Sequence, residues 1–270
     1  MGKFMAWMRV IRTKFFLAGI PPFILGASIA WYESKTLDPL LFLLTLAGII
    51  LAMAGSYTFN EYFDFMVDVK IKNEDITPFN SGSRVLPEGL VKPKNVFIAG
   101  IIFWAIATII GLYIIYLKGL MIFYLSILGI FSGVFYTAPP IRLAYRGLGE
   151  FFIGISFGIL ITLGSYYVLT TSYSLMSNAL YVSIVPALLI TAVIWINEFP
   201  DYTNDRECGK FNLVARMGRD RARYVYHALI IIPYIIVLFG IILGIIPFFS
   251  IISFITIPLA YKSMKIVKNH

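Results

Sequence analysis

Eight apolar stretches, each about as long as a membrane is thick, constrain the fold of this chain more than any other feature of its sequence. A helix needs about 20 apolar residues to cross the hydrocarbon core of a bilayer. Hydrophobic residues make up 59% of the 270 residues and charged residues only 13%, which is unusual for a soluble protein. We therefore predict an all-α, polytopic transmembrane helical bundle. Its eight spans are expected near residues 15–32, 40–60, 95–117, 120–137, 149–171, 178–198, 223–246 and 248–264.

The distribution of Lys and Arg predicts how these spans are oriented. With eight spans, 20 of the 22 basic residues fall on one side, and only Lys35 and Lys118 fall on the other. Connections rich in Lys and Arg usually stay in the cytoplasm. We therefore expect a multi-pass protein of the cell membrane whose N-terminus and polar loops are cytoplasmic. The net charge of +8 is explained by these membrane borders, so membrane lipid is the expected partner and nucleic acid is not.

The acidic residues gather on the same side as the basic ones. Twelve of the fourteen Asp and Glu lie there, and the exceptions are Glu33 and Asp38. The rule that orients basic residues makes no demand on acidic ones, so this clustering needs another cause. A polar site of both charge signs at the cytoplasmic ends of the helices supplies one. The single Cys208 excludes a disulfide framework.

Two copies of the pattern Asn-x3-Asp-x3-Asp lie at the cytoplasmic ends of the second and sixth spans. They comprise Asn60, Asp64 and Asp68, and then Asn197, Asp201 and Asp205. With seven Asp in the chain, a given Asn has Asp at both positions by chance roughly once in a thousand cases. A spacing of four keeps the side chains on one helical face. Mg²⁺ prefers such oxygens and completes its coordination with water and phosphate. The pair predicts a metal-bridged diphosphate site; the alternative is that these acids only mark the water-exposed ends of two helices.

The three cytoplasmic loops add basic residues that could bind phosphate. The candidates are Lys70, Lys72 and Arg84 in the first loop, Arg142 and Arg146 in the second, and Lys210 and Arg216 in the third. The first loop is rich in Ser, Gly and Pro, which predicts turns. The Pro139-Pro140 pair in the second loop is expected to end the fourth span. The alternative role of each basic residue is to fix topology or to contact lipid headgroups.

Four helices separate the two motifs in the sequence. This spacing suggests a single transmembrane domain, residues 1–270, built from two halves at 1–137 and 138–270, each with its motif on its second helix. Sequence similarity between the halves is weak, so the pattern is an expectation from helix order alone.

Three blocks of the sequence resemble the UbiA superfamily of intramembrane prenyltransferases. They are the first Asn-x3-Asp-x3-Asp, the segment Tyr-x-x-Pro-Pro-x-Arg-Leu at 136–143, and the second Asn-x3-Asp-x3-Asp. Their order and positions cover nearly the whole chain. The runs at 83–86, 147–150 and 205–218 are most similar to the branch that prenylates 1,4-dihydroxy-2-naphthoate on the menaquinone path. Asn212 departs from that branch, which more often has Thr at this position.

The resemblance implies a helical bundle around a central cavity with a cytoplasmic cap of helical loops. Members usually have nine spans, one more than we predict. It also implies a prenyltransferase that uses two Mg²⁺ ions, an isoprenyl diphosphate of geranylgeranyl length or longer, and an aromatic acceptor. The implied catalytic residues are Asp64, Asp68, Asp201 and Asp205. The implied metal ligands are these four residues together with Asn60 and Asn197. The implied substrate-binding residues are Asn60, Asn197, Arg12, Lys14, Arg84, Arg142, Lys210, Arg216 and Tyr136.

The expected chemistry begins with loss of diphosphate to leave an allylic cation, which needs a water-poor pocket. Aromatic faces could stabilise the cation, and the candidates are Tyr57, Tyr62, Phe135 and Tyr136, whose alternative role is packing.

The sequence is also compatible with other prenyl acceptors, such as 4-hydroxybenzoate or a glycerol-phosphate lipid. A secondary transporter is the competing class, but transport would favour ionisable residues near the bilayer midplane, and the predicted helix interiors lack them.

Overall fold

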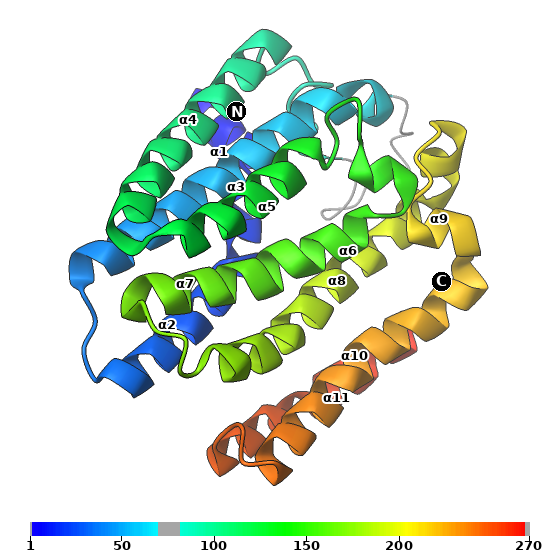
Figure 1. Cartoon of the computed structure of the whole chain (residues 1–270). Coiled ribbons are helices and arrows are strands. Elements are labelled where there is room, and N and C mark those ends of the chain that lie inside the picture. Colours follow the sequence, from blue (N-terminus) through cyan, green and yellow to red (C-terminus); the bar gives the residue numbers. More distant parts are fainter. Residues whose placement is uncertain (1, 70–81, 268–270) are drawn as a thin grey trace.

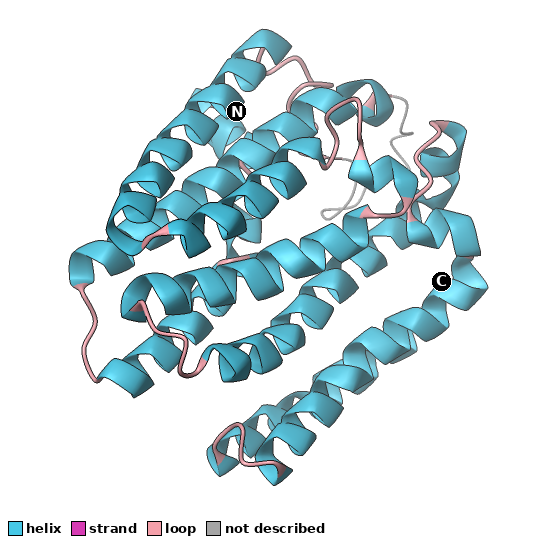
Figure 2. Cartoon of the chain, in the orientation of Figure 1, coloured by secondary structure: helices cyan, strands magenta, loops and turns pink. Residues whose placement is uncertain are grey.

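All regular structure in the described part of the chain is helical. The computed structural model describes residues 2–69 and 82–267 (Figure 2). The elements are α1 (Lys3–Val10), η1 (Thr13–Ala18), α2 (Ile20–Ser34), α3 (Pro39–Asp68), α4 (Pro93–Lys118), α5 (Leu120–Phe135), η3 (Leu143–Arg146), α6 (Gly149–Ile153), η4 (Gly154–Leu160), α7 (Ile161–Thr170), α8 (Met176–Glu207), α9 (Leu213–Met217), α10 (Arg219–Ile242), η5 (Phe248–Thr256) and α11 (Ile257–Val267). The predicted all-α fold is confirmed.

Every predicted apolar run coincides with a helix. In the described ranges, six helices are long and apolar enough to cross a membrane: α3, α4, the continuous α6–η4–α7, α8, α10 and the continuous η5–α11. A seventh results if the N-terminal helices and α2 are one span, bent by 42°. α5 is apolar but has only 16 residues. The chain is thus a multi-pass membrane protein, and helix length alone does not fix the number of spans at eight.

The two motif helices extend past the apolar runs that predict them, as the spacing of four in each motif requires. α3 continues past the predicted end at residue 60 to Asp68, and α8 continues past 198 to Glu207. Each Asn-x3-Asp-x3-Asp motif therefore lies entirely on one helix, so its members share a face. α3 begins where Asp38 accepts hydrogen bonds from the backbone N–H groups of Leu40 and Leu41, which is an ordinary N-cap.

The second loop begins where the sequence predicts. α5 ends at Phe135, before the Pro139-Pro140 pair, whose peptide bond is cis. The loop then folds back on itself, because the N–H of Ala144 donates to the carbonyl of Tyr136 at 2.9 Å. This fold places η3 beside the end of α3, where the first motif lies.

The helices form a bundle whose two motif-bearing ends point the same way. α3 packs along α4, α2 packs along α7, and α8 packs against both η4 and α10. Figure 1 shows that η3, α9 and the end of α11 gather at the end where α3 and α8 finish. The α2–α3, α4–α5 and α7–α8 connections lie at the opposite end. α10 and the antiparallel η5–α11 lie outside α8, so they extend the bundle on one side (Figure 1).

Small residues set the closest helix contacts. A Cβ added to Gly26 of α2 would overlap Ser165 Oγ and the carbonyl oxygen of Thr162 on α7. A Cβ on Gly158, in the π-helical η4, would overlap Ala187 of α8. Helices inside a membrane gain stability mainly from such close packing, because lipid is as apolar as the side chains.

We expect Gly26→Ala to destabilise the protein, since the new methyl group must push α2 away from α7. Overpacking of this kind costs about 1–3 kcal/mol. Thermal unfolding in detergent should show a lower midpoint. Gly111→Ala is the matched control, because Gly111 is also inside a helix and an added Cβ there meets no atom within 4 Å. Equal midpoints for the two variants would show that the α2–α7 contact is not tight.

Candidate active site

A cavity of about 1220 Å³ lies between the helices and is lined by both Asn-Asp motifs. On α3 its lining extends from Thr45 to Asp68, a stretch of roughly 34 Å at 1.5 Å per residue. The cavity therefore follows most of the length of a membrane-spanning helix.

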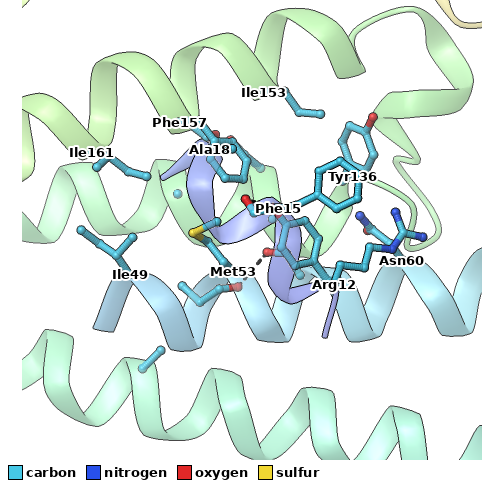
Figure 3. Close-up of a pocket in the computed structure, with 18 of the residues that line it drawn as sticks. Arg12, Phe15, Ala18, Ile49, Met53, Asn60, Tyr136, Ile153, Phe157 and Ile161 are labelled. Carbon is cyan, nitrogen blue, oxygen red and sulfur yellow. Dashed lines mark hydrogen bonds between the residues drawn. The ribbon is translucent and has the colours of Figure 1, made fainter. Parts of the chain in front are cut away.

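The two ends of this cavity differ in chemistry. Figure 3 shows Arg12, Asn60 and Tyr136 together at one end, and Ile49 and Ile161 toward the other. All the motif carboxylates belong to the polar end, because they lie on the last turns of α3 and α8. A ligand with a charged head and a long apolar tail fits this division.

Most of the predicted site residues line the cavity. These are Asn60, Asp64, Asp68, Asn197, Asp201, Asp205, Arg12, Lys14, Arg84, Lys210 and Tyr136. Arg142 and Arg216 are exposed and are not part of the lining. Lys70 and Lys72 lie outside the described residues.

Lys210 connects the two motifs. Its Nζ lies 3.6 Å from Asp205 Oδ1. Burial alone would lower the pKa of Lys210, but the carboxylates of Asp205, Asp64 and Asp201 raise that pKa well above its ordinary value. Lys210 also interacts electrostatically with Asp68. Carboxylates of both motifs therefore act electrostatically on one ammonium group, as expected if the two motifs face each other.

The second motif is also held by the start of α9. Asn212 Nδ2 donates to Asp205 Oδ2 at 2.7 Å, and Asn212 Oδ1 accepts the N–H of Ala215 at 2.7 Å. The same side chain therefore caps a helix and orients a motif carboxylate. A threonine hydroxyl can likewise accept from one group and donate to another.

The first motif receives hydrogen bonds from two loops. Thr137 Oγ1 donates to Asn60 Oδ1 at 3.0 Å, and the hydroxyl of Tyr145 donates to Asp64 Oδ1 at 2.8 Å. Burial, followed by the charge of Asp64, raises the pKa of Tyr145, so its hydroxyl remains a donor. Arg84 Nη1 donates to the carbonyl oxygen of Asp68, the last residue of α3, at 2.5 Å.

Arg12 and Glu61 form an ion pair beside the first motif. Arg12 Nη2 lies 3.4 Å from Glu61 Oε2, and Glu61 is fully buried. Glu61 also accepts hydrogen bonds from the N–H and the hydroxyl of Ser83. The Nε of Arg12 is buried without a hydrogen-bond partner. A buried guanidinium N–H in that state is a donor available to an anionic ligand.

The motif oxygens suit a hard divalent cation. Asp68 Oδ2 is buried and has no hydrogen-bond partner. Across residues 2–69 and 82–267, no group of three or more His, Cys, Asp or Glu side chains is arranged to hold a metal ion by itself. A cation at this site would thus take part of its coordination from phosphate and water, which is the usual behaviour of Mg²⁺. The carboxylate and amide residues present fit that cation.

Several residues of this network were not assigned a role from the sequence. They are Glu61, Thr137, Tyr145, Glu150, Glu198 and Asn212. One signal was available: a Glu directly follows the Asn in each motif. One residue along a helix is a turn of about 100°. Glu61 accordingly lies outside the cavity lining, whereas Glu198 is still part of it. Glu61 accepts a hydrogen bond from the hydroxyl of Ser83, and Glu150 accepts one from the backbone N–H of Leu213.

The aromatic candidates divide into two pairs. Tyr57 and Tyr136 line the cavity, whereas Tyr62 and Phe135 do not. The Tyr57 hydroxyl donates to the carbonyl of Phe15 at 3.3 Å, which holds the ring at the cavity wall. Tyr62 packs instead against other rings, so it serves the alternative role of packing.

Comparison with known proteins gives consistent matches. A model described as the UbiA prenyltransferase family matches residues 20–270. The 1,4-dihydroxy-2-naphthoate octaprenyltransferase of Bacillus subtilis is 27% identical over 257 residues, which cover 95% of this chain and 80% of that protein. A UbiA homolog from Archaeoglobus fulgidus bound to GPP and Mg²⁺ has a TM-score of 0.65 at 17% identity, covering 98% of this chain and 87% of that one. A structure of digeranylgeranylglyceryl phosphate synthase has a TM-score of 0.62 at 19% identity, covering 100% and 95%.

We expect Asn212→Ala to loosen α9, because it removes both the helix cap and the donor to Asp205. Losing such a cap costs about 1 kcal/mol. Hydrogen exchange followed by mass spectrometry should show faster exchange in the peptide 209–218. Asn212→Thr is the control and should exchange like the unchanged protein, since its hydroxyl can replace both contacts. Equal exchange in all three proteins would contradict the assigned role of Asn212.

Proposed function

Because the chain belongs to the UbiA prenyltransferase family, we propose that it transfers a polyprenyl group from an isoprenyl diphosphate to an aromatic acceptor within the membrane, with release of diphosphate. The chain is a prenyltransferase, and its fold is that of the A. fulgidus homolog solved with GPP and Mg²⁺. One observation carries the proposal: both Asn-Asp motifs and Lys210 line the polar end of one long cavity.

The diphosphate binds at this polar end. Two Mg²⁺ ions would be held by the oxygen atoms of Asn60, Asp64, Asp68, Asn197, Asp201 and Asp205. When bound, Mg²⁺ neutralises the negative charge that develops on the diphosphate as its C–O bond breaks. The residues of the chain hold the diphosphate in one orientation and exclude bulk water from the bond that breaks.

The basic residues in the cavity wall complete the diphosphate site. Arg12 offers its unpartnered Nε, and Lys210 offers an ammonium group that stays charged between the motifs. Lys14 and Arg84 line the same end. Arg216 lies outside the lining and donates through Nε to the carbonyl of Phe211, so it supports the loop that carries Lys210.

The prenyl tail lies along the apolar part of the cavity. The lining of α3 between Asn60 and Thr45 spans roughly 22 Å. An extended isoprene unit adds about 5 Å, because it contributes four carbon–carbon bonds of about 1.5 Å in a zigzag. The cavity thus fits about four units, which is the length of a geranylgeranyl group. The rings of Tyr57 and Tyr136 can face the allylic cation near the diphosphate.

For the acceptor we propose 1,4-dihydroxy-2-naphthoate. Similarity over most of the chain to the B. subtilis enzyme named for this acceptor supports the proposal. The fold shared with digeranylgeranylglyceryl phosphate synthase favours a glycerol-phosphate lipid as the second candidate. 4-Hydroxybenzoate is a third candidate, which rests on the family alone.

The distribution of basic residues supports a cytoplasmic position for the diphosphate end. We further propose that the whole chain acts as one domain of two halves, with each motif on the second membrane span of its half, α3 or α8. The basic loops that follow α3 and α8 then supply the groups that bind the diphosphate.

The proposed reaction is tested by incubating the purified protein with geranylgeranyl diphosphate, Mg²⁺ and each acceptor, followed by mass spectrometry. We expect the prenylated naphthoate as the main product and no product after chelation of the metal. Asp64→Ala and Asp201→Ala should each lower the rate by at least about 100-fold, because each removes charge-binding oxygen atoms from the reacting diphosphate.

Asp220→Ala is the matched control for these variants. Asp220 is almost fully exposed at the start of α10 and contacts only Arg223 among the ion pairs of the described residues. Its loss should leave the rate unchanged. Full activity of Asp64→Ala or Asp201→Ala would exclude the motif as the diphosphate site, and a product formed only with a glycerol-phosphate lipid would favour the second acceptor.

Filling the apolar part of the cavity should change the preferred chain length. Gly111 lines the cavity, and a Cβ there meets no atom within 4 Å. We expect Gly111→Leu to lower kcat/KM for geranylgeranyl diphosphate about tenfold and to spare geranyl diphosphate, whose shorter tail does not reach this level. Ala105→Leu, on the exposed face of the same helix, is the control. An equal loss with both substrates would show that the tail does not follow this path.

A further inference from the structure

We propose that Tyr145 is a positioning residue of the diphosphate site, which fixes the carboxylate of Asp64 for metal coordination. The proposal rests on the function proposed above and concerns a residue that lies outside both sequence motifs. Its hydroxyl donates to Asp64 Oδ1 at 2.8 Å. The two residues are 81 positions apart in the sequence, so the contact exists only because the second loop folds onto the end of α3.

The backbone of Tyr145 is fixed from two directions. Its N–H donates to the carbonyl of Arg142 at 2.9 Å, and its carbonyl accepts the N–H of Phe211 at 3.1 Å. Phe211 follows Lys210, which contacts Asp205 of the second motif. Tyr145 therefore joins a carboxylate of the first motif to the loop that serves the second.

The ring of Tyr145 is fixed by Arg142. The guanidinium carbon of Arg142 lies 5.1 Å from the ring centroid, an ordinary cation–π distance. Arg142 is exposed and does not line the cavity. The structure thus gives Arg142 an indirect role: it supports Tyr145, and Tyr145 contacts the motif.

A neutral hydroxyl is well suited to orient a metal ligand. A hydrogen bond to one carboxylate oxygen limits rotation of the side chain and keeps the negative charge that a cation needs. An ammonium or guanidinium group in this position would compete with the cation for that charge. Outer partners of this kind typically change metal affinity by 10–100-fold when they are removed.

The test is Tyr145→Phe, which removes only the hydroxyl and keeps the ring against Arg142. We expect the Mg²⁺ concentration for half-maximal activity to rise about 10-fold, while kcat at saturating Mg²⁺ stays within about threefold and the KM for the acceptor is unchanged. Binding of Mn²⁺ in the presence of pyrophosphate, measured by electron paramagnetic resonance, should weaken by a similar factor. That measurement does not depend on turnover.

Tyr181→Phe is the matched control. The Tyr181 hydroxyl donates to the carbonyl of Ile236 at 2.7 Å, a comparable hydrogen bond that is remote from the motifs. It should lower thermal stability as much as Tyr145→Phe and leave both metal measurements unchanged. A second variant, Arg142→Gln, should shift the Mg²⁺ dependence in the same direction as Tyr145→Phe but by less.

Unchanged Mg²⁺ dependence and Mn²⁺ binding in Tyr145→Phe would overturn the proposal, and so would equal shifts in Tyr145→Phe and Tyr181→Phe. These outcomes are distinct from failure of the proposed function. If Asp64→Ala retains full activity, the motif is not the site. If Asp64→Ala is inactive and Tyr145→Phe behaves like the unchanged protein, only the role of Tyr145 is wrong.

Discussion

The structure depends on placing opposite charges together at the end of an otherwise apolar bundle. A buried carboxylate is costly unless it is paired, hydrogen-bonded or bound to a metal. Lys210 and Arg12 offset part of that cost for the acids at the ends of α3 and α8. The remaining negative charge is suited to a cation that arrives with its substrate. The same groups that hold the helix ends together therefore prepare the site for its ligands.

The loops at this end orient, through hydrogen bonds, the motif side chains that the helices carry. α3 and α8 supply the motif residues, and the loops supply Thr137, Tyr145 and Asn212, which hold those residues in place. Sites built on helices are more precise than sites built on loops alone. Thr137 and Tyr145 reach residues that are 77 and 81 positions away in the sequence, whereas Asn212 holds Asp205 at the end of the helix that its own loop follows.

The features that depend on local periodicity, namely the helices and the residues that share a helical face, could be predicted best from the sequence. Apolar runs predicted the helices, and the spacing of four placed Asp64 and Asp201 in the wall of the cavity. Contacts between distant segments could not be read in this way. Arg142 is predicted at the site, but this residue, which directly precedes η3, has a left-handed backbone conformation, and Tyr145 reaches Asp64 instead. A turn of this kind depends on the folded loop, which one sequence does not reveal.

The short helix α5 has a consequence for the surrounding lipid. Its 16 residues cover about 24 Å, less than the roughly 30 Å of a hydrocarbon core. Bilayers adapt to such hydrophobic mismatch by becoming thinner nearby. The headgroups beside α5 then lie nearer to Tyr136 and the loop that follows it than they would in an unperturbed bilayer. An amphiphilic acceptor resting among the headgroups would need to descend only a short way to meet the reacting carbon.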